Sequence, residues 1–357
     1  MKIGRVALVL TLLAGLSQTA PSAGAAPGDR LAFVTGDDRL VVANRDGSGV
    51  RWLARNVSRA SWSPRGDRLA YARLSELRVV NPASGQDYEV WRLPTGPAGC
   101  QVIACAGVTT NVAHPAWSPT DERIAFVAGA GPLAMVGWGL GGAVLRTKIF
   151  IISSDGSGLT PLTATHSGEM DPAWSPDGGR IAFNSFVDGA FTVMVATPGS
   201  STLPEVVSPL GIVAGAPVWS PGGDRIAFLG TSAEEAVPYD CYLYVMNADG
   251  SETRQLAHMP VCADTKPSWS PDGRWLTYAA AGLNVLNSGV HVVAADGSSR
   301  RQLTSGYDYG SAWSPDGGSI AFARFAQGQD GVYLVGTDGG WSQRIVESPV
   351  GRPFWAP

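Results

Sequence analysis

One short motif occurs six times along the chain, and this repetition restricts the fold more than any other feature. Its clearest copy spans Asp171–Phe183. Pro172 cannot donate a backbone hydrogen bond, so it suits the first residue of a strand. The Ser-Pro-Asp-Gly that follows Trp174 has the composition of a type I turn, and Ile-Ala-Phe then predicts a second strand. The motif therefore predicts a β-hairpin.

The spacing inside the motif is constant. An aromatic residue stands nine positions after each Trp, in the pairs Trp62 and Tyr71, Trp117 and Phe126, Trp174 and Phe183, Trp219 and Phe228, Trp269 and Tyr278, and Trp313 and Phe322. The chain ends carry the two halves of a seventh copy, since Gly28–Phe33 matches the second strand and Pro353–Pro357 the first. Pairing these halves would close a ring and remove its open edge.

A second hairpin lies between successive motifs. Its clearest copy has Tyr242–Met246 and Thr253–Leu256 on either side of Asp249-Gly250, and Asp-Gly between apolar strands is a strong hairpin signal. Each unit thus has four antiparallel strands, which we term A (with the Trp), B, C and D. Units of ~40 to 50 residues with four strands each are typical of β-propeller blades. We predict an all-β fold with one domain over residues 26–357, a seven-bladed β-propeller; six blades is the alternative.

The repeated pattern Pro-x-Trp-Ser-Pro-Asp-Gly-x-x-Ile-Ala-Phe, followed by Tyr-Val and Asp-Gly-Ser, resembles the TolB-type, WD-repeat-like propeller repeats. Similar repeats form the propeller of prolyl-oligopeptidase-type peptidases. The resemblance covers nearly all of residues 28–357. It implies a β-propeller and, through the Tol-Pal system, a place in the cell envelope.

The topology predicts two unlike faces. The tight A–B and C–D turns emerge on one face, the tight-turn face, and the longer B–C and D–A connections on the other, the long-loop face. The longer connections are predicted over 94–113, 127–147, 163–171, 229–240, 257–266 and 304–311. The stretch 127–147 is rich in Gly, apolar and without Asp or Glu, and we interpret it as a flap over its neighbours or, alternatively, a membrane- or partner-contacting flap. The repeated Trp residues are interpreted as core between blades, because a ligand seldom needs seven equivalent rings.

The start of the chain predicts export. Lys2 and Arg5 precede an apolar run and the small-residue sequence Ala23-Gly24-Ala25, so residues 1–25 are interpreted as a signal peptide, with a retained membrane anchor as the alternative. Its removal takes two of the 26 basic residues and none of the 30 acidic ones, leaving six more acidic than basic residues. That balance argues against a nucleic-acid partner. The expected location is the periplasm, the cell envelope or the medium.

Four cysteines in an exported chain predict two disulfides. We favour the local pairs Cys100 with Cys105 and Cys241 with Cys262 among the three connectivities. Metal ligation by these cysteines is the alternative, but neither spacing is Cys-x-x-Cys.

Polar residues just ahead of the A-strand Trp residues form the candidate site. In a propeller these positions lie around the mouth of the central channel, and we predict binding residues at His114, Glu169, Asp171, Asp264, Lys266, Asp308 and Arg352. His166, His258, Tyr239, Tyr307 and Tyr309 are predicted on the same face, while His291 is predicted to pack inside a C strand. No cofactor is predicted; Ca²⁺ on the carboxylates is the alternative, against solvated rim charges.

The motifs of common hydrolases are absent from the sequence. It contains neither Gly-x-Ser-x-Gly nor His-Glu-x-x-His, so we predict no catalytic residue. The function expected is that of a monomeric binding module or scaffold that contacts another cell-envelope protein through its long-loop face. The alternatives are a propeller enzyme, either a lyase or a hydrolase, and a glycan-binding lectin, each with its site at the channel.

Overall fold

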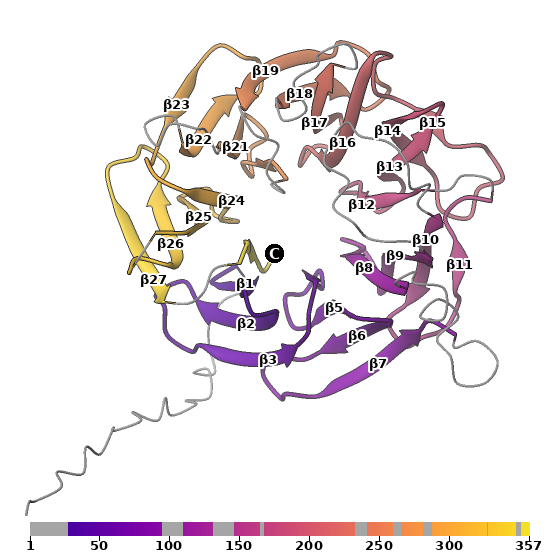
Figure 1. Cartoon of the computed structure of the whole chain (residues 1–357), viewed down its shortest axis with the longest axis horizontal. Coiled ribbons are helices and arrows are strands. Elements are labelled where there is room, and N and C mark those ends of the chain that lie inside the picture. The colour runs from indigo at the N-terminus through magenta and orange to yellow at the C-terminus, as the bar shows by residue number, and fades with distance from the viewer. Residues whose placement is uncertain are drawn as a thin grey trace, which may run out of the picture.

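Seven four-stranded antiparallel sheets are arranged around a central axis in the computed structural model (Figure 1). The structure describes residues 28–94, 110–130, 146–164, 168–232, 241–259, 266–280, 288–326, 328–347 and 351–357. Every regular element in these ranges is a strand. The prediction of an all-β, seven-bladed propeller is confirmed, and the six-bladed alternative is wrong.

Each blade runs from an innermost A strand to an outermost D strand. Blade 1 consists of β28 (Pro353–Trp355), β1 (Arg30–Val34), β2 (Arg39–Asn44) and β3 (Arg51–Arg55). Blade 2 consists of β4 (Arg59–Trp62), β5 (Leu69–Arg73), β6 (Glu76–Val80) and β7 (Asp87–Arg92). Blade 3 consists of β8 (Thr110–Trp117), β9 (Arg123–Ala130), β10 (Arg146–Ser153) and β11 (Thr160–Pro161). Blade 4 consists of β12 (Met170–Trp174), β13 (Ile181–Val187), β14 (Ala190–Ala196) and β15 (Glu205–Val206).

The remaining three blades follow the same order. Blade 5 consists of β16 (Ile212–Trp219), β17 (Arg225–Ser232), β18 (Cys241–Asn247) and β19 (Arg254–Met259). Blade 6 consists of β20 (Ser268–Trp269), β21 (Trp275–Ala280), β22 (Gly289–Ala294) and β23 (Arg300–Gln302). Blade 7 consists of β24 (Asp308–Trp313), β25 (Ser319–Arg324), β26 (Gly331–Gly336) and β27 (Ser342–Glu347).

The two ends of the chain close the ring. In blade 1, β28 pairs with β1 in the register Leu31 to Trp355, Ala32 to Phe354 and Phe33 to Pro353. This is the seventh hairpin predicted from the two half motifs. In Figure 1 the C-terminus lies at the centre of the ring beside the start of the described chain.

The repeated Trp residues join neighbouring blades. The indole of Trp174 donates a hydrogen bond of 3.0 Å to the carbonyl of Ala116 in the preceding blade, and Trp62, Trp219, Trp269 and Trp355 make the equivalent bond. An Arg from the preceding blade also lies over the ring, as Arg123 does over Trp174 at 4.9 Å. The prediction that these Trp residues form core between blades agrees with the burial of Trp62, Trp117, Trp174, Trp219 and Trp269, while Trp313 and Trp355 are partly buried.

Four A strands contain a β-bulge at the same place. In β8, β12, β16 and β24 the pairing with the B strand shifts register around the third residue before the Trp. That residue has a left-handed backbone, with φ of 49° at His114, 53° at Asp171, 54° at Ala216 and 63° at Gly310. A bulge turns the strand and redirects a side chain. The bulge therefore sets the direction of the side chain at these four positions.

Several predicted boundaries need correction. Residues 127–130, 229–232 and 257–259 extend the strands β9, β17 and β19 and are not loop, because the long edges of these blades continue the ladder. His258 lies on the outer strand β19 against Tyr242, with ring centroids 4.9 Å apart, and not at the channel mouth. His291 is buried in β22 against Tyr278, as predicted.

Other predictions lie outside the described residues. They are the signal peptide 1–25, the stretch 131–145, His166, Tyr239 and Asp264. Cys241 is buried at the start of β18 and belongs to a disulfide, but Cys100, Cys105 and Cys262 are outside the described ranges, so the pairing stays a prediction. Within those ranges no helix has the length and apolarity needed to cross a membrane.

Candidate functional site

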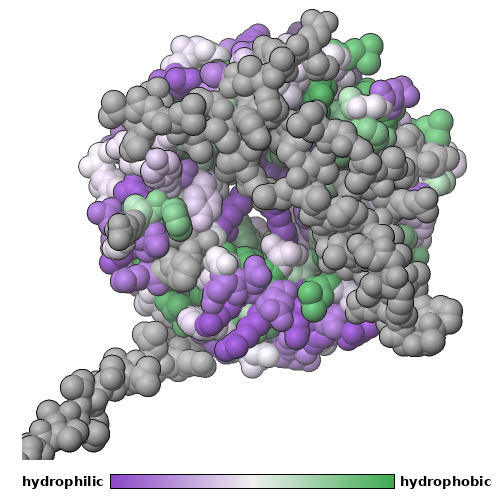
Figure 2. Space-filling view, in the orientation of Figure 1, coloured by the Kyte–Doolittle hydropathy of each residue, from purple (hydrophilic) through white to green (hydrophobic). Residues whose placement is uncertain are grey.

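A cavity of about 1040 Å³ occupies the central channel. It runs from the long-loop face, where Thr35, Tyr307 and Phe325 line it, to the A–B turns, where Pro64 and Pro119 do. Figure 2 shows an opening at the centre of this face of the ring, with both hydrophilic and apolar residues beside it. The innermost strands supply most of the wall.

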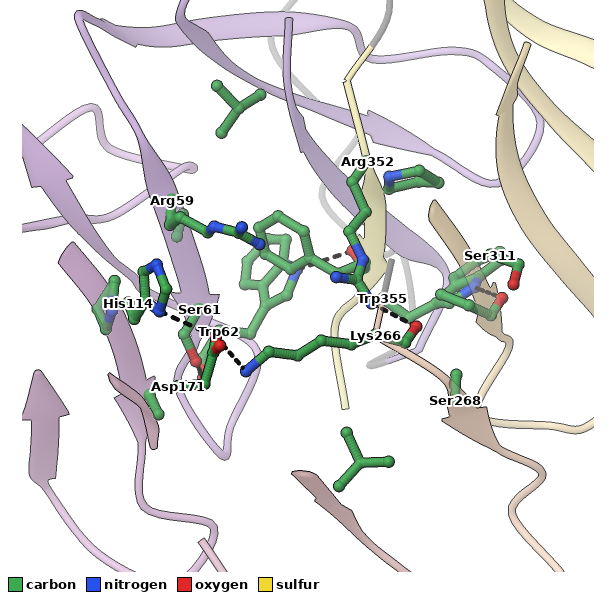
Figure 3. Close-up of a pocket in the computed structure, with 18 of the residues that line it drawn as sticks. Arg59, Ser61, Trp62, His114, Asp171, Lys266, Ser268, Ser311, Arg352 and Trp355 are labelled. Carbon is green, nitrogen blue, oxygen red and sulfur yellow. Dashed lines mark hydrogen bonds and ion pairs between the residues drawn. The ribbon is translucent and has the colours of Figure 1, made fainter. Parts of the chain in front are cut away.

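The polar wall comes from one position of the repeat. The third residue before each A-strand Trp forms a set that we term the channel ring, consisting of Arg59, His114, Asp171, Ala216, Lys266, Gly310 and Arg352. All five of its charged or polar side chains line the cavity. Figure 3 shows them pointing inward from different blades. Five of the seven equivalent positions of the repeat thus line one cavity, and the residue type differs between them.

Asp171 is the centre of an ion-pair network in the ring. Its Oδ1 lies 2.9 Å from Nδ1 of His114 and 2.9 Å from Nζ of Lys266. Burial alone would raise the pKa of Asp171, but attraction from Lys266 and His114 outweighs it and holds this pKa well below its ordinary value. The carboxylate is therefore ionised and has two partners on different blades.

Lys266 experiences opposing effects. Burial lowers the pKa of its ammonium group, and the attraction of Asp171 offsets only part of that change. Repulsion from Arg59 and Arg352 lowers the pKa further. Three cationic side chains thus influence one another in the same part of the channel.

Gly310 makes room for Arg352. A Cβ atom at Gly310 would come within 2.6 Å of the Arg352 Cγ, so the Arg352 side chain occupies the space that a larger ring residue would fill. Arg352 donates a hydrogen bond of 2.6 Å to the backbone carbonyl of Lys266. In Figure 3 the guanidinium groups of Arg59 and Arg352 extend toward one another across the cavity.

Two predicted binding residues have structural partners away from the ring. Glu169 is fully buried and accepts hydrogen bonds from the backbone of Ile149 at 2.8 Å and from the Thr163 hydroxyl. Burial raises the pKa of Glu169. Asp308 lies at the cavity wall, but Arg324 donates to both of its oxygens, at 2.7 and 2.8 Å. Neither carboxylate faces the channel as an unpartnered acid.

The structure therefore brings together His114, Asp171, Lys266 and Arg352 of the predicted set. Asp308 lines the same cavity but is paired with Arg324, and Glu169 is not among the lining residues. Arg59 was not predicted, because Ala60 replaces the Pro that marks most A strands. Counting three residues back from Trp62 would have found it. Among the described residues no three His, Cys, Asp or Glu side chains are grouped as metal ligands. The Ca²⁺ alternative stays a prediction.

Tyr307 and Phe325 form the apolar part of the channel mouth. Their side chains are 52% and 64% exposed, and both line the cavity from blade 7. The backbone N–H of Phe325 donates to the carbonyl of Tyr307 at 2.9 Å, which fixes the two connections side by side. Tyr309 lines the same wall. The channel thus combines exposed aromatic rings at its mouth with cations inside.

Comparison with known proteins agrees with the repeat. Residues 142–282 match the family described as the TolB beta propeller domain. The Tol-Pal system protein TolB of Bordetella pertussis is 29% identical over 254 residues, which cover 69% of this chain and 54% of that protein. The chain thus spans about half the length of that relative.

Solved structures share the propeller fold. TolB from Acinetobacter baumannii superposes with a TM-score of 0.56 at 16% identity, over 77% of this chain and 63% of that one. An oligogalacturonate lyase in complex with manganese superposes with a TM-score of 0.64 at 15% identity, over 86% and 85% of the two chains. At these identities the likeness shows the fold alone. The chain is thus a seven-bladed β-propeller, and its residues 142–282 match the TolB beta propeller domain.

Proposed function

We propose that this protein is an exported binding module that contacts a partner protein of the cell envelope through its long-loop face. The observation that carries the proposal is the channel mouth, where exposed aromatic side chains border a cavity lined with charged groups. Aromatic anchors near a pocket are typical of protein-binding surfaces. The sequence match to TolB of the Tol-Pal system supports a role in the envelope.

Exposed apolar side chains also support the choice of face. The long-loop face carries Leu74, Phe186, Leu210, Tyr307 and Phe325 among the large hydrophobic residues that the structure shows exposed. The C–D turns of the opposite face carry Leu159, Leu203 and Trp341. Among the large apolar side chains in the described ranges, only Tyr307 and Phe325 combine exposure with a place at the cavity. They are the residues we expect a partner to cover.

An enzymatic role has less support. The fold is shared with a lyase, but a shared fold does not carry function. His114 and Asp171 have the spacing of a base and the group that orients it, yet Asp171 is also held by Lys266. A glycan-binding role would use the same aromatic side chains at the channel mouth. Whether protein or glycan is recovered in a capture experiment distinguishes the two roles.

The test is affinity capture from the native cell envelope with immobilised protein of residues 26–357, followed by crosslinking and mass spectrometry. We expect one envelope protein to be enriched by the wild type and lost with the double variant Tyr307→Ala and Phe325→Ala. The matched control, Leu203→Ala with Trp341→Ala, removes exposed apolar side chains from the opposite face and should leave capture unchanged.

Capture that survives the Tyr307 and Phe325 changes but is lost with the control variant would assign binding to the tight-turn face. Recovery of glycan in place of protein from the same beads would favour the lectin alternative. Circular dichroism of each variant checks that the fold is retained.

A further inference from the structure

A guanidinium group covers six of the seven A-strand Trp rings. Its carbon lies 4.6 to 5.7 Å from the ring centroid, from Arg180 over Trp219 to Arg45 over Trp355. A cation at this distance is attracted by the negative face of the indole. In the described part of the chain no cation lies over the seventh ring, that of Trp313 in blade 7. Trp313 is therefore the exception in the repeat.

The exception originates at one position of the repeat, the sixth residue after each A-strand Trp. This position, or its equivalent at the start of β1, supplies the covering cation for five rings: Arg30, Arg68, Arg123, Arg180 and Arg225. Blade 6 has Trp275 there, and blade 7 has Ser319. Since each of these arginines covers the Trp of the next blade, blade 6 has no Arg at this position to cover Trp313.

Blade 7 shows how a missing Arg is replaced. Ser319 offers no cation to the next ring, that of Trp355, and Arg45 lies over that ring at 5.7 Å instead. Arg45 follows β2 of blade 1, and it donates hydrogen bonds to Asp316 and, at 3.0 Å, to the Ser319 hydroxyl. A guanidinium from elsewhere in the sequence thus fills the place that Ser319 leaves.

The place beside Trp313 is a pocket of about 340 Å³ between blades 6 and 7. These blades are neighbours in the ring (Figure 1). The indoles of Trp275 and Trp313 line the pocket, and both pack partly buried against the core cluster that contains Phe322. Turn residues 270–272 and 316–317 line it too, which places it at the tight-turn face. Its volume lies at the lower end of the range for small-ligand sites, ~300 to 1,000 Å³. It therefore suits one small group.

The pocket also contains the hydrogen-bond acceptor that covered rings share. Four of the covering arginines donate to the carbonyl of a Gly in the A–B turn of the next blade: Arg30 to Gly66 at 2.6 Å, Arg123 to Gly178 at 3.4 Å, Arg180 to Gly223 at 3.3 Å and Arg225 to Gly273 at 2.8 Å. The equivalent residue of blade 7, Gly317, lines the pocket. Trp313 and Gly317 thus repeat the ring and the carbonyl that hold a guanidinium elsewhere in this molecule.

Asp272 supplies an acidic group at the edge of the pocket. It is exposed, and its carboxylate accepts hydrogen bonds from the Ser270 hydroxyl and from the backbone N–H of Arg274. The bond from Ser270 is the main cause that lowers the pKa of Asp272, so this carboxylate is ionised at neutral pH. Asp272 forms no ion pair with a described residue. A cation that enters the pocket can therefore pair with it.

The other charged residues of the pocket leave the Trp313 ring uncovered. Asp316 is paired with Arg45. Arg301 lies over Trp275 on the opposite wall, 5.6 Å from the ring centroid. As a cation it repels a second cation and limits the affinity of the pocket. Attraction by net charge is therefore small, and the ring and the carbonyl decide what binds.

We propose that the pocket between blades 6 and 7 binds a guanidinium group from outside the chain, over Trp313 and beside the Gly317 carbonyl and the Asp272 carboxylate. A guanidinium is planar, so its face stacks on an aromatic ring while its N–H groups donate to oxygens at its edge. It has two sources, an arginine side chain of a partner protein or a small guanidinium compound. The pocket lies on the face opposite to the channel mouth, and the proposal does not rest on the proposed function.

The test follows the indole N–H signals by NMR in purified protein labelled with nitrogen-15 at tryptophan. The chain has 12 Trp residues, and the variants Trp275→Phe and Trp313→Phe assign the two signals of the pocket. Acetylarginine methylamide is the small probe, and the pentapeptide Gly-Gly-Arg-Gly-Gly with both ends blocked presents the same group within a chain. Pentapeptides with citrulline or lysine in place of arginine retain only the shape or only the charge.

We expect the arginine probes to shift the Trp313 signal saturably. The citrulline peptide should cause no shift, and the lysine peptide should bind more weakly because its ammonium lacks the planar set of donors. Asp272→Asn should weaken binding by roughly twofold to fivefold, since the lost charge is exposed. The matched control Asp155→Asn removes an exposed carboxylate from a C–D turn of the same face and should bind as the wild type does.

Trp275→Arg is the decisive variant. It restores the Arg of the repeat, which should cover Trp313 from within the chain and abolish binding of both arginine probes. Arg180→Ala is the reverse change and keeps the test decisive if Trp275→Arg does not fold. It uncovers Trp219 beside the Gly223 carbonyl and should create a second site, which is detected at the Trp219 signal.

The proposal would be overturned if neither arginine probe shifted the Trp313 signal of the wild type, or if the citrulline peptide bound equally well. Unchanged binding by folded Trp275→Arg would also overturn it. Binding of the small probe alone would assign the pocket to a small guanidinium compound, and binding of the pentapeptide as well would assign it to an arginine side chain of a partner.

Discussion

Two positions of the same strands, only two residues apart, have opposite roles. The third residue before each A-strand Trp forms the channel ring, which collects five charged or polar side chains around one cavity. The fifth residue before the Trp is buried wherever the structure describes it, as Val57, Val112, Glu169, Ala214 and Asp308. The first position gathers polar groups around the cavity, and the second gives each buried acid a partner of its own.

Four of the seven A strands show how the two positions come to differ. In a regular strand, residues two apart point to the same face of the sheet. In β8, β12, β16 and β24 the third residue before the Trp lies in the bulge and has a left-handed backbone, so its side chain leaves that alternation. We expect charge at the fifth position to act on stability and charge at the third to act in the channel, and four sets of substitutions test this contrast.

The largest effect is expected from Asp308→Ala. The Asp308 side chain is fully buried, and its loss leaves Arg324 without the carboxylate that accepts two of its hydrogen bonds. Breaking a buried pair costs about 3 to 5 kcal/mol. Equilibrium unfolding in urea measures it. Asp37→Ala, which removes the exposed partner of Arg39, should lower the free energy of unfolding far less than Asp308→Ala does, and equal losses for both variants would contradict the assignment.

A smaller effect is expected from Asp171→Asn. The change leaves Lys266 beside Arg59 and Arg352 without its counter-charge, and since these side chains are partly exposed we expect a loss of about 1 to 3 kcal/mol at pH 7. The pKa of Asp171 is lowered on folding, so its contribution is present above the unfolded pKa and is lost as pH falls through the folded value. Wild type and variant should therefore converge in acid. Unfolding measured at pH 7 and at successively lower pH below 4 checks this, and a stability difference between wild type and variant that does not narrow in acid would be the contrary result.

Glu169 gives an effect of opposite pH dependence. Burial raises its pKa in the folded protein, so ionisation of Glu169 removes stability as pH rises through the interval between the unfolded and folded values. Glu169→Gln cannot ionise and should gain stability relative to wild type from about pH 4 upward. Glu169→Ala leaves the Ile149 N–H unpaired and should lose about 1 to 3 kcal/mol. Thermal melts of both variants from pH 4 to 8 compare their stabilities. If Glu169→Gln lowers the stability as much as Glu169→Ala does, the charge of Glu169 is required for stability.

The smallest effect on stability is expected from Arg59→Gln combined with Arg352→Gln. Removing like charges from the ring relieves repulsion on Lys266, so we expect the free energy of unfolding to stay within about 1 kcal/mol of wild type. Urea unfolding at low and high salt measures it. A loss as large as that of Asp308→Ala would place these arginines among the structural pairs and remove the contrast between the two positions.

Most of the fold can be predicted from the sequence, because each copy of the repeated motif predicts the same hairpin. The constant spacing from Trp to the closing aromatic predicted the A–B hairpins, and the half motifs at Gly28–Phe33 and Pro353–Pro357 predicted the closure. The site was less predictable. Lys266 and Arg352 are predicted correctly, because both lie shortly before an A-strand Trp. The sequence does not show that the third residue before the Trp differs in environment from the fifth. The prediction therefore groups Glu169 and Asp308 with Lys266 and Arg352.

The missing information is three-dimensional. Whether an acid such as Asp308 faces the channel depends on a bulge and on a partner, Arg324, that lies 16 residues away on the next strand. The strand that begins with Arg59 has no bulge, and no Pro follows Arg59. Arg59 is recognised as a channel-ring residue only when all seven A strands are aligned on their Trp.

The pairing of β28 with β1 also sets an order of assembly. Blade 1 receives its innermost strand from residues 353–355, so it is incomplete until these residues pair with β1. Arg352 immediately precedes that strand. The pairing that closes the ring therefore also brings the Arg352 side chain to the channel, which couples completion of the fold to completion of the cavity wall.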